Sequence, residues 1–176
     1  MNQRLRILHL EDEPDYSQLI REMLAREGVD AELVLATTRA EFDAALAREK
    51  FDIILADYSL PSFTGIQALE IMRVKTPETP FVLVSGTIGE QAAIESLRAG
   101  ATDYVLKHTP ERLVPAVRRA VEEAQERVRR RQAETELIRR EKYFRALNDN
   151  SLDIVTLLNG EGVFQFNSSS VKRTLG

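Results

Sequence analysis

The chain has 176 residues, of which 43% are hydrophobic and 30% charged, with a formal net charge of −4 and no cysteine. This composition excludes a wholly disordered chain, disulfides and thiolate chemistry, and the negative charge argues against a generic nucleic-acid binder. No apolar run approaches the ~20 residues of a membrane span, and the N-terminus turns acidic too early for a signal peptide. We therefore expect a soluble, cytoplasmic protein with no membrane association.

Five short apolar segments rich in Ile, Val and Leu recur along the first part of the chain. Continuous runs of this kind are typical of parallel strands that are buried on both faces. Amphipathic helical patterns separate them; Gly28 is a predicted C-cap, and Thr38 with Glu41 a predicted capping box. The alternation predicts a doubly wound α/β fold with helices on both faces of a parallel sheet. The predicted strands are residues 6–10, 31–36, 52–56, 81–84 and 103–106.

One long helix is predicted from about residue 111 to residue 147, because no Gly or Pro interrupts residues 116–147. Its apolar side chains alternate three and four apart, which is the spacing of a coiled-coil seam. We expect a homodimer through this helix; a solvated, charged helix is the alternative. The seam positions are Val114, Val117, Val121, Ala124, Val128, Thr135 and Ile138, with Arg131 a poor fit.

The last segment, residues 148–176, changes character again. Apolar stretches at 153–158 and 163–166 flank Asn159-Gly160-Glu161-Gly162, which is a strong hairpin signal. A lone hairpin of this length cannot bury a core of its own.

Polar side chains stand at four of the five predicted strand ends, where ligands bind in open α/β sheets. Three carboxylates in one crevice repel each other unless a cation is bound, and oxygen-only ligands favour Mg²⁺. A hydroxyl and an ammonium beside them would complete a phosphoryl site, with Asp57 the best-placed nucleophile. Each residue alone has an ordinary structural explanation. The set is Glu11, Asp12 and Glu13, then Asp57, Ser85 and Lys107.

Over about residues 4–125 the chain resembles the receiver domain of two-component response regulators. The resemblance rests on Ile7–Pro14, on Asp52–Pro61 with Gly65, on Val84–Gly86 and on Gly100–Lys107. Receivers are flavodoxin-like, so the resemblance implies a five-stranded parallel sheet in the order 2-1-3-4-5.

The resemblance also implies a role for each polar residue. Asp57 would accept the phosphoryl group from a phosphohistidine of a cognate histidine kinase or histidine phosphotransfer protein. Lys107 would pair with that group, while Ser85 and Tyr104 would change position with it. The Mg²⁺ ligands would be Glu11, Asp12, Asp57 and the backbone carbonyl of Ser59.

Two positions depart from the family pattern. His108 follows Lys107 where the family usually has proline, which puts the pose of Lys107 in doubt, and Glu11 replaces the commoner aspartate. His9 is interpreted as a packed residue of the first strand rather than a phosphoacceptor.

The tail resembles the first third of a PAS sensor domain, through Tyr143–Leu147, Ser151–Val155, Asn159–Gly162 and Ser168–Gly176. The expected organisation is a receiver at 1–125, a signalling helix at 126–147 and the N-terminal part of a PAS domain at 148–176. The chain is expected to be an N-terminal fragment that catalyses only its own aspartyl phosphorylation and dephosphorylation. Full-length proteins of this architecture often end in a histidine kinase or a cyclic-dinucleotide enzyme, and the sequence does not choose between them.

Two alternatives stay open. One is a degenerate receiver that serves as a dimerisation or interaction scaffold. The other is a Mg²⁺-dependent phosphatase acting through an aspartyl phosphate, which Glu11-Asp12-Glu13 disfavours because such enzymes want Asp-x-Asp there. No basic reading helix is visible, so direct binding of nucleic acid is not expected.

Overall fold

The computed structural model describes residues 4–61, 63–86, 90–150 and 156–167. Its compact units divide between Arg127 and Val128, and each is described by itself. In chain order the elements are β1 (Leu5–Leu10), α1 (Pro14–Arg26), β2 (Ala31–Ala36), α2 (Arg39–Arg48), β3 (Ile53–Asp57), α3 (Gly65–Lys75), β4 (Phe81–Ser85), α4 (Glu90–Arg98), β5 (Asp103–Leu106), a 3₁₀ turn (Pro110–Arg112), α5 (Leu113–Asn150), β6 (Thr156–Leu158) and β7 (Phe164–Asn167).

The first unit contains a five-stranded sheet in the order β2-β1-β3-β4-β5, in which every neighbouring pair is parallel. The predicted fold and strand order are therefore confirmed. Strands β3 and β4 each end one residue later than the sequence predicted, at Asp57 and Ser85. Both residues are thus held by sheet hydrogen bonding rather than by a loop.

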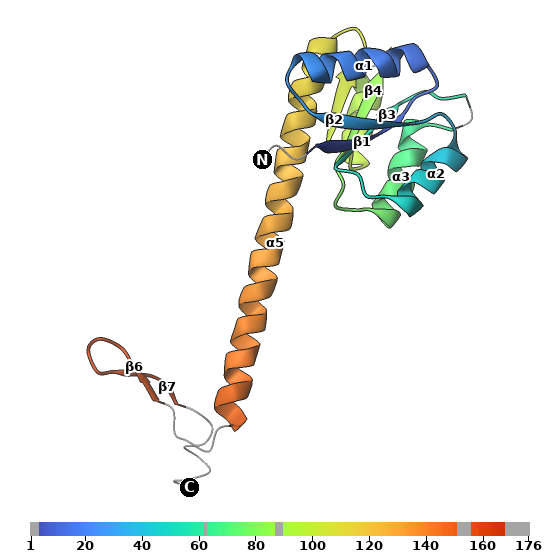
Figure 1. Cartoon of the computed structure of the whole chain (residues 1–176). Helices are drawn as coiled ribbons and strands as arrows, with labels where there is room; N and C mark the ends of the chain where they lie inside the picture. Colours follow the sequence, from blue (N-terminus) through green and yellow to red (C-terminus); the bar gives the residue numbers. More distant parts are fainter. Residues whose placement is uncertain (1–3, 62, 87–89, 151–155, 168–176) are drawn as a thin grey trace. The chain divides into compact units, whose positions relative to one another are not determined.

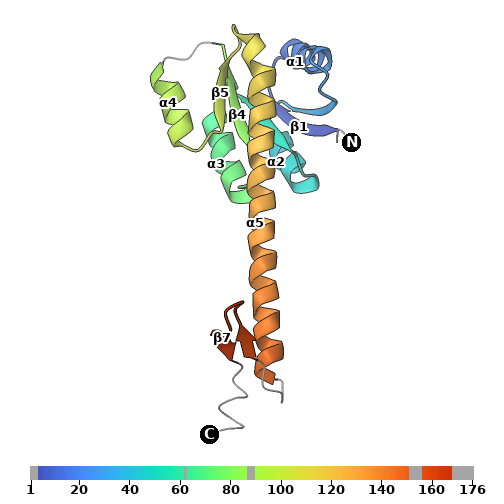
Figure 2. The same cartoon turned by 90° about the vertical axis from the view of Figure 1, so that its left-hand side faces the viewer.

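Helices cover both faces of this sheet (Figures 1 and 2). On one face, α1 and the start of α5 pack on side chains such as Ile7 and Leu55. On the other, α2 and α3 pack on side chains such as Leu8 and Ile54. Burying each such side chain contributes about 1.5–3 kcal/mol, so the continuous apolar strands fix the sheet between two cores.

The ends of the helices are set locally. Gly28 has φ +70°, and the N–H groups of Gly28 and Val29 donate to the carbonyls of Ala25 and Leu24, so the predicted C-cap is confirmed as a Schellman motif. At α2 the Thr38 hydroxyl accepts from the N–H of Glu41. The Glu41 carboxylate accepts from the N–H and the hydroxyl of Thr37, and the reciprocal interaction with the Thr38 N–H is weaker than these.

Helix α5 is a single helix of 38 residues, preceded by the 3₁₀ turn where the sequence predicted the helix to begin. The prediction of a coiled-coil seam along its first turns is wrong. Those positions are buried in the first unit, so no partner helix can reach them in this fold; they are Val114, Val117, Val121 and Ala124. The three valines pack in the same core as the sheet and α1.

In the second unit, α5 continues with exposed side chains as far as residue 146. Strands β6 and β7 pair antiparallel around the turn, where Asn159 accepts from the N–H groups of Glu161 and Val163. A hairpin therefore forms at the predicted turn, with strands Thr156–Leu158 and Phe164–Asn167, while residues 151–155 and 168–176 lie outside the described residues. Among the described residues, no helix is both long enough and apolar enough to cross a membrane.

Candidate functional site

The sheet topology brings the sequence-predicted site residues to one edge. Strand β3 lies between β1 and β4, and β4 lies between β3 and β5. Asp57 pairs in register with Val84, and Ser85 with Leu106. Parallel strands end at the same edge of a sheet. The four adjacent strands therefore bring together two residues that end a strand, Asp57 and Ser85, and two that come directly after one, Glu11 and Lys107.

Three carboxylates and one ammonium form the centre of this edge. Glu11, Asp12 and Asp57 each place a carboxylate oxygen within 4.8 Å of the others, with Glu11 and Asp57 buried and Asp12 exposed. Lys107 Nζ lies 2.8 Å from Glu11 Oε2 and 2.8 Å from Asp57 Oδ2. The ammonium therefore bridges the two buried acids.

Each of the two buried carboxylates also accepts a hydrogen bond from a backbone N–H group. The N–H of Ser59 donates to Asp57 Oδ1 at 3.1 Å, and the N–H of Glu13 donates to Glu11 Oε1 at 3.2 Å. Gly65, the first residue of α3, lies so close that a Cβ there would stand 2.6 Å from the Asp57 carbonyl oxygen. The start of α3 thus needs glycine in order to pack on the end of β3.

Burial dominates the electrostatics of Glu11. It raises the pKa of this carboxyl, the nearby Asp57 charge raises it further, and Lys107 acts in the opposite direction. Burial would lower the pKa of Lys107, but the hydrogen bonds and charges of Asp57 and Glu11 outweigh it, so that pKa is raised. One ammonium faces three acids, and this leaves a deficit of positive charge.

The residues fit a divalent cation. The donor set is oxygen-only, as Mg²⁺ prefers. Glu11 Oε2 is buried, and the Lys107 ammonium at 2.8 Å is its close cation among the described residues. The carboxylates of Glu11, Asp12 and Asp57 would hold such an ion.

His9 lies behind this cluster and is fully buried on β1. Its Nδ1 hydrogen-bonds with the Ser17 hydroxyl at 2.9 Å, and its Nε2 lies 3.9 Å from Glu11 Oε2. Burial, with the charges of Lys107 and Arg21, lowers the pKa of His9 to about 3. The interpretation of His9 as a packed residue is confirmed.

The proposed switch residues lie on β4 and β5. Ser85 is buried, and its carbonyl accepts from the N–H of Lys107 at 2.7 Å. Burial raises the pKa of the Tyr104 phenol, while the Ser85 hydroxyl opposes this. The Tyr104 hydroxyl is buried and has no hydrogen bond of good geometry among the described residues.

Sequence reasoning missed Tyr16 and Ser17, in the first turn of α1, which contact Lys107 and His9. Their closeness in the chain to Glu11–Glu13 was the available signal. The bond from Lys107 to His108 is trans, and Lys107 nevertheless reaches both buried acids.

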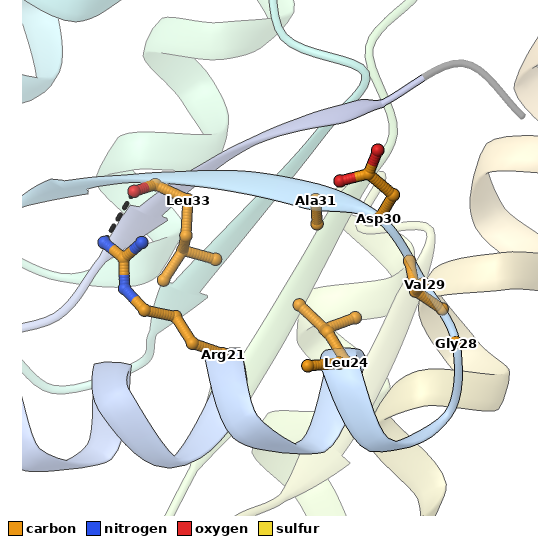
Figure 3. A pocket seen from close by; sticks show the side chains of 8 residues that line it. Arg21, Leu24, Gly28, Val29, Asp30, Ala31 and Leu33 are labelled. Atoms are coloured by element: carbon orange, nitrogen blue, oxygen red, sulfur yellow. Dashed lines mark hydrogen bonds between the residues drawn. The ribbon is translucent and has the colours of Figure 1, made fainter.

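A separate cavity of about 440 Å³ lies between α1 and β2 (Figure 3). Arg21 donates from Nη2 to the Leu33 carbonyl at 2.6 Å across it. Its wall includes Leu24, Gly28 and Asp30, and it holds none of the strand-end residues.

The fold and this edge define an α/β domain of the flavodoxin-like class with an acidic cluster at the carboxyl ends of its strands, and the family comparison identifies the family. The response regulator receiver domain model matches residues 7–118. The chain belongs to the response regulator receiver domain family.

One similar protein is matched over only part of its length. The chain is 33% identical over 104 residues to the response regulator protein PilR of Pseudomonas aeruginosa, a match that covers 59% of this chain and 23% of that protein. The chain therefore spans about a quarter of the length of this relative.

Two solved structures illustrate the fold. A CheY-like receiver domain protein from Methanospirillum hungatei is 27% identical with a TM-score of 0.63, covering 71% of this chain and 99% of that one. The receiver domain of a sensor histidine kinase from Pseudomonas aeruginosa, solved with a magnesium ion coordinated in its active site cleft, is 24% identical with a TM-score of 0.58, covering 68% and 98%.

Proposed function

We propose that Asp57 is the phosphoacceptor of this receiver domain. The observation that carries the proposal is the position of Asp57 at the end of the central strand, 2.8 Å from the Lys107 ammonium and beside Glu11 and Asp12. It is the one acid of the cluster that ends a strand buried on both faces, so its backbone is the most firmly held.

The chemistry follows from these groups. A carboxylate oxygen of Asp57 attacks the phosphorus of a phosphohistidine on a histidine kinase or phosphotransfer protein. The P–O bond forms as the P–N bond breaks, and the imidazole leaves with the electron pair. Lys107 neutralises an equatorial oxygen. A bound Mg²⁺, held by Glu11, Asp12, Asp57 and the Ser59 carbonyl, would supply further positive charge.

Ser85 and Tyr104 are proposed to report the phosphorylated state. Ser85 ends β4 next to β3, from where its hydroxyl can turn toward a phosphoryl group on Asp57. Tyr104, whose hydroxyl is not held by a hydrogen bond of good geometry among the described residues, would then change rotamer. This would alter the surface at β5 and the start of α5.

Incubating the whole chain with acetyl phosphate and Mg²⁺ tests the proposal. We expect one phosphoryl adduct on intact protein, mapped to Asp57 and absent from Asp57→Asn. Asp43→Asn is the matched control, because Asp43 pairs with Lys75 on the surface and should keep the adduct. No adduct on the native chain would favour the scaffold alternative. Hydrolysis of small phosphoesters that persists in Asp57→Asn would favour the phosphatase.

We further propose that α5 relays the state and pairs with a second copy through its exposed part. The buried stripe of α5 ends at Ala124, and the same spacing continues on the outside through Val128 and Ile138, which are 36% and 46% exposed. The hairpin β6–β7, beyond the helix, supports the proposal that residues 148–176 begin a PAS domain. The two-state step that would transmit the signal is part of this proposal.

Sedimentation of the whole chain at tens of micromolar tests the pairing. We expect a dimer that Val128→Glu together with Ile138→Glu converts to a monomer, because both charges would enter the seam. Leu137→Glu is the matched control, since Leu137 is adjacent, 68% exposed and off the seam. A native chain that stays monomeric, phosphorylated or not, would overturn the dimer.

A further inference from the structure

Tyr16 stands directly against the catalytic lysine. The Lys107 Nζ lies 4.4 Å from the centroid of the Tyr16 ring, which is within the range of a cation–π contact. The ammonium has three N–H groups and no acceptor. Within the part of the chain that the structure describes, it contacts Glu11, Asp57 and this ring, and Tyr16 is the neutral group of the three.

The ring is itself fixed by its surroundings. Tyr16 follows Pro14 in the first turn of α1, and its N–H donates to the Glu13 carbonyl at 3.1 Å. Its ring also lies 6.3 Å from that of the buried His9, tilted by 49°. A half-buried ring backed by a helix and a strand is a rigid surface for the ammonium.

Besides its two carboxylate partners, the Tyr16 ring is the contact that restrains the end of the Lys107 side chain. Strand β5 ends at Leu106, so Lys107 lies at the start of a turn, and its side chain has four rotatable bonds whose ordering carries an entropic cost. A group that orders the ammonium before the phosphoryl group arrives lowers this cost at the moment of reaction.

We infer that Tyr16 is a positioning residue for phosphoryl transfer, acting through the face of its ring on the Lys107 ammonium. This inference rests on the proposed role of Asp57. The ring face, and not the hydroxyl, is the active feature, because the Lys107 Nζ lies over the centroid of the ring. Phenylalanine should therefore substitute for it, and leucine should not.

The rate of Asp57 phosphorylation by acetyl phosphate tests the inference in four variants of the whole chain. We expect Tyr16→Leu to slow it about three- to tenfold and Tyr16→Phe to stay within about twofold of the native rate. In a Lys107→Met background, Tyr16→Leu should have no further effect, because the group on which the ring acts is gone. An unchanged rate in Tyr16→Leu, or the same slowing in both backgrounds, would overturn the inference.

An NMR measurement separates this inference from the function on which it rests. The Lys107 Cε protons should show an upfield ring-current shift that is kept in Tyr16→Phe and lost in Tyr16→Leu. Absence of that shift in the native chain overturns the contact, whether or not Asp57 is phosphorylated. Absence of the Asp57 adduct in the native chain, with the shift present, overturns the proposed phosphoacceptor and the catalytic role of Tyr16 together, and leaves the contact.

Discussion

Replacing Lys107 by methionine is expected to slow the phosphorylation of Asp57 by about a hundredfold or more. Methionine keeps an apolar stem of similar length but removes the ammonium that lies 2.8 Å from both Asp57 and Glu11. Loss of one preorganised electrostatic group at a reacting centre costs on the order of 10²–10³ in rate. The initial rate of adduct formation with acetyl phosphate, at saturating Mg²⁺, measures this.

The same substitution should change stability in a pH-dependent way. Lys107 lowers the pKa of Glu11 against the effect of burial, so in Lys107→Met that pKa rises further. A carboxyl with a raised folded-state pKa stabilises the fold below its unfolded pKa, and this stability is lost as the pH rises through the folded pKa. Without divalent cations, the variant should therefore lose stability toward neutral pH, and added Mg²⁺ should restore part of it.

Lys75→Met is the matched control for Lys107→Met. Lys75 pairs with Asp43 on the surface, and surface pairs contribute about 0–1 kcal/mol. Its phosphorylation rate and its pH profile of unfolding should both match the native chain. A Lys107→Met variant that is phosphorylated at the native rate would contradict the role of the ammonium.

Acidification should destabilise the protein through His9. Burial first, then the charges of Lys107 and Arg21, lower the pKa of His9 to about 3 from 6.5. The unfolded chain therefore binds a proton at His9 between these values and the folded chain does not. This stability is present above pH 6.5 and is lost as the pH falls toward 3.

The expected loss through His9 is about 3 kcal/mol between pH ~7 and pH ~4. Denaturant unfolding in the absence of divalent cations measures it, by comparison with His9→Asn, whose amide can still bond Ser17 but does not titrate. His108→Asn is the matched control, because His108 is exposed and is the only other histidine. Equal pH profiles for the native chain and His9→Asn would contradict this account of His9.

Much of the site could be predicted because it depends on strand ends. Periodicity locates a strand to within a residue or two, and parallel strands place their carboxyl ends at one edge whatever the sequence of the intervening helices. Glu11, Asp57, Ser85 and Lys107 were therefore found without a structure. Tyr16 was not, because its ring reaches Lys107 from a helix that the strand-end argument does not position.

The pKa of His9 also could not be predicted from the sequence. The sequence indicates a packed residue on an apolar strand, but the depth of burial decides its pKa. That depth depends on α1, which brings Ser17 against Nδ1, and on the positive charges of Lys107 and Arg21. Ser17 and Arg21 lie on α1, whereas Lys107 follows β5 and is distant from His9 in the sequence.

Helix α5 shows most clearly which features the sequence determines and which features depend on the tertiary structure. The sequence by itself determined that a helix with one apolar stripe runs from about residue 111 to residue 147, and that acids and a lysine meet at one edge of a parallel sheet. Only the tertiary structure decided what covers the stripe: Val114, Val117 and Val121 pack in the core of the receiver's own sheet, and Val128 and Ile138 stay exposed. The physical reason is that the spacing of apolar residues predicts which face of a helix is buried but not what buries it. The spacing is the same whether the partner is a sheet or a second helix.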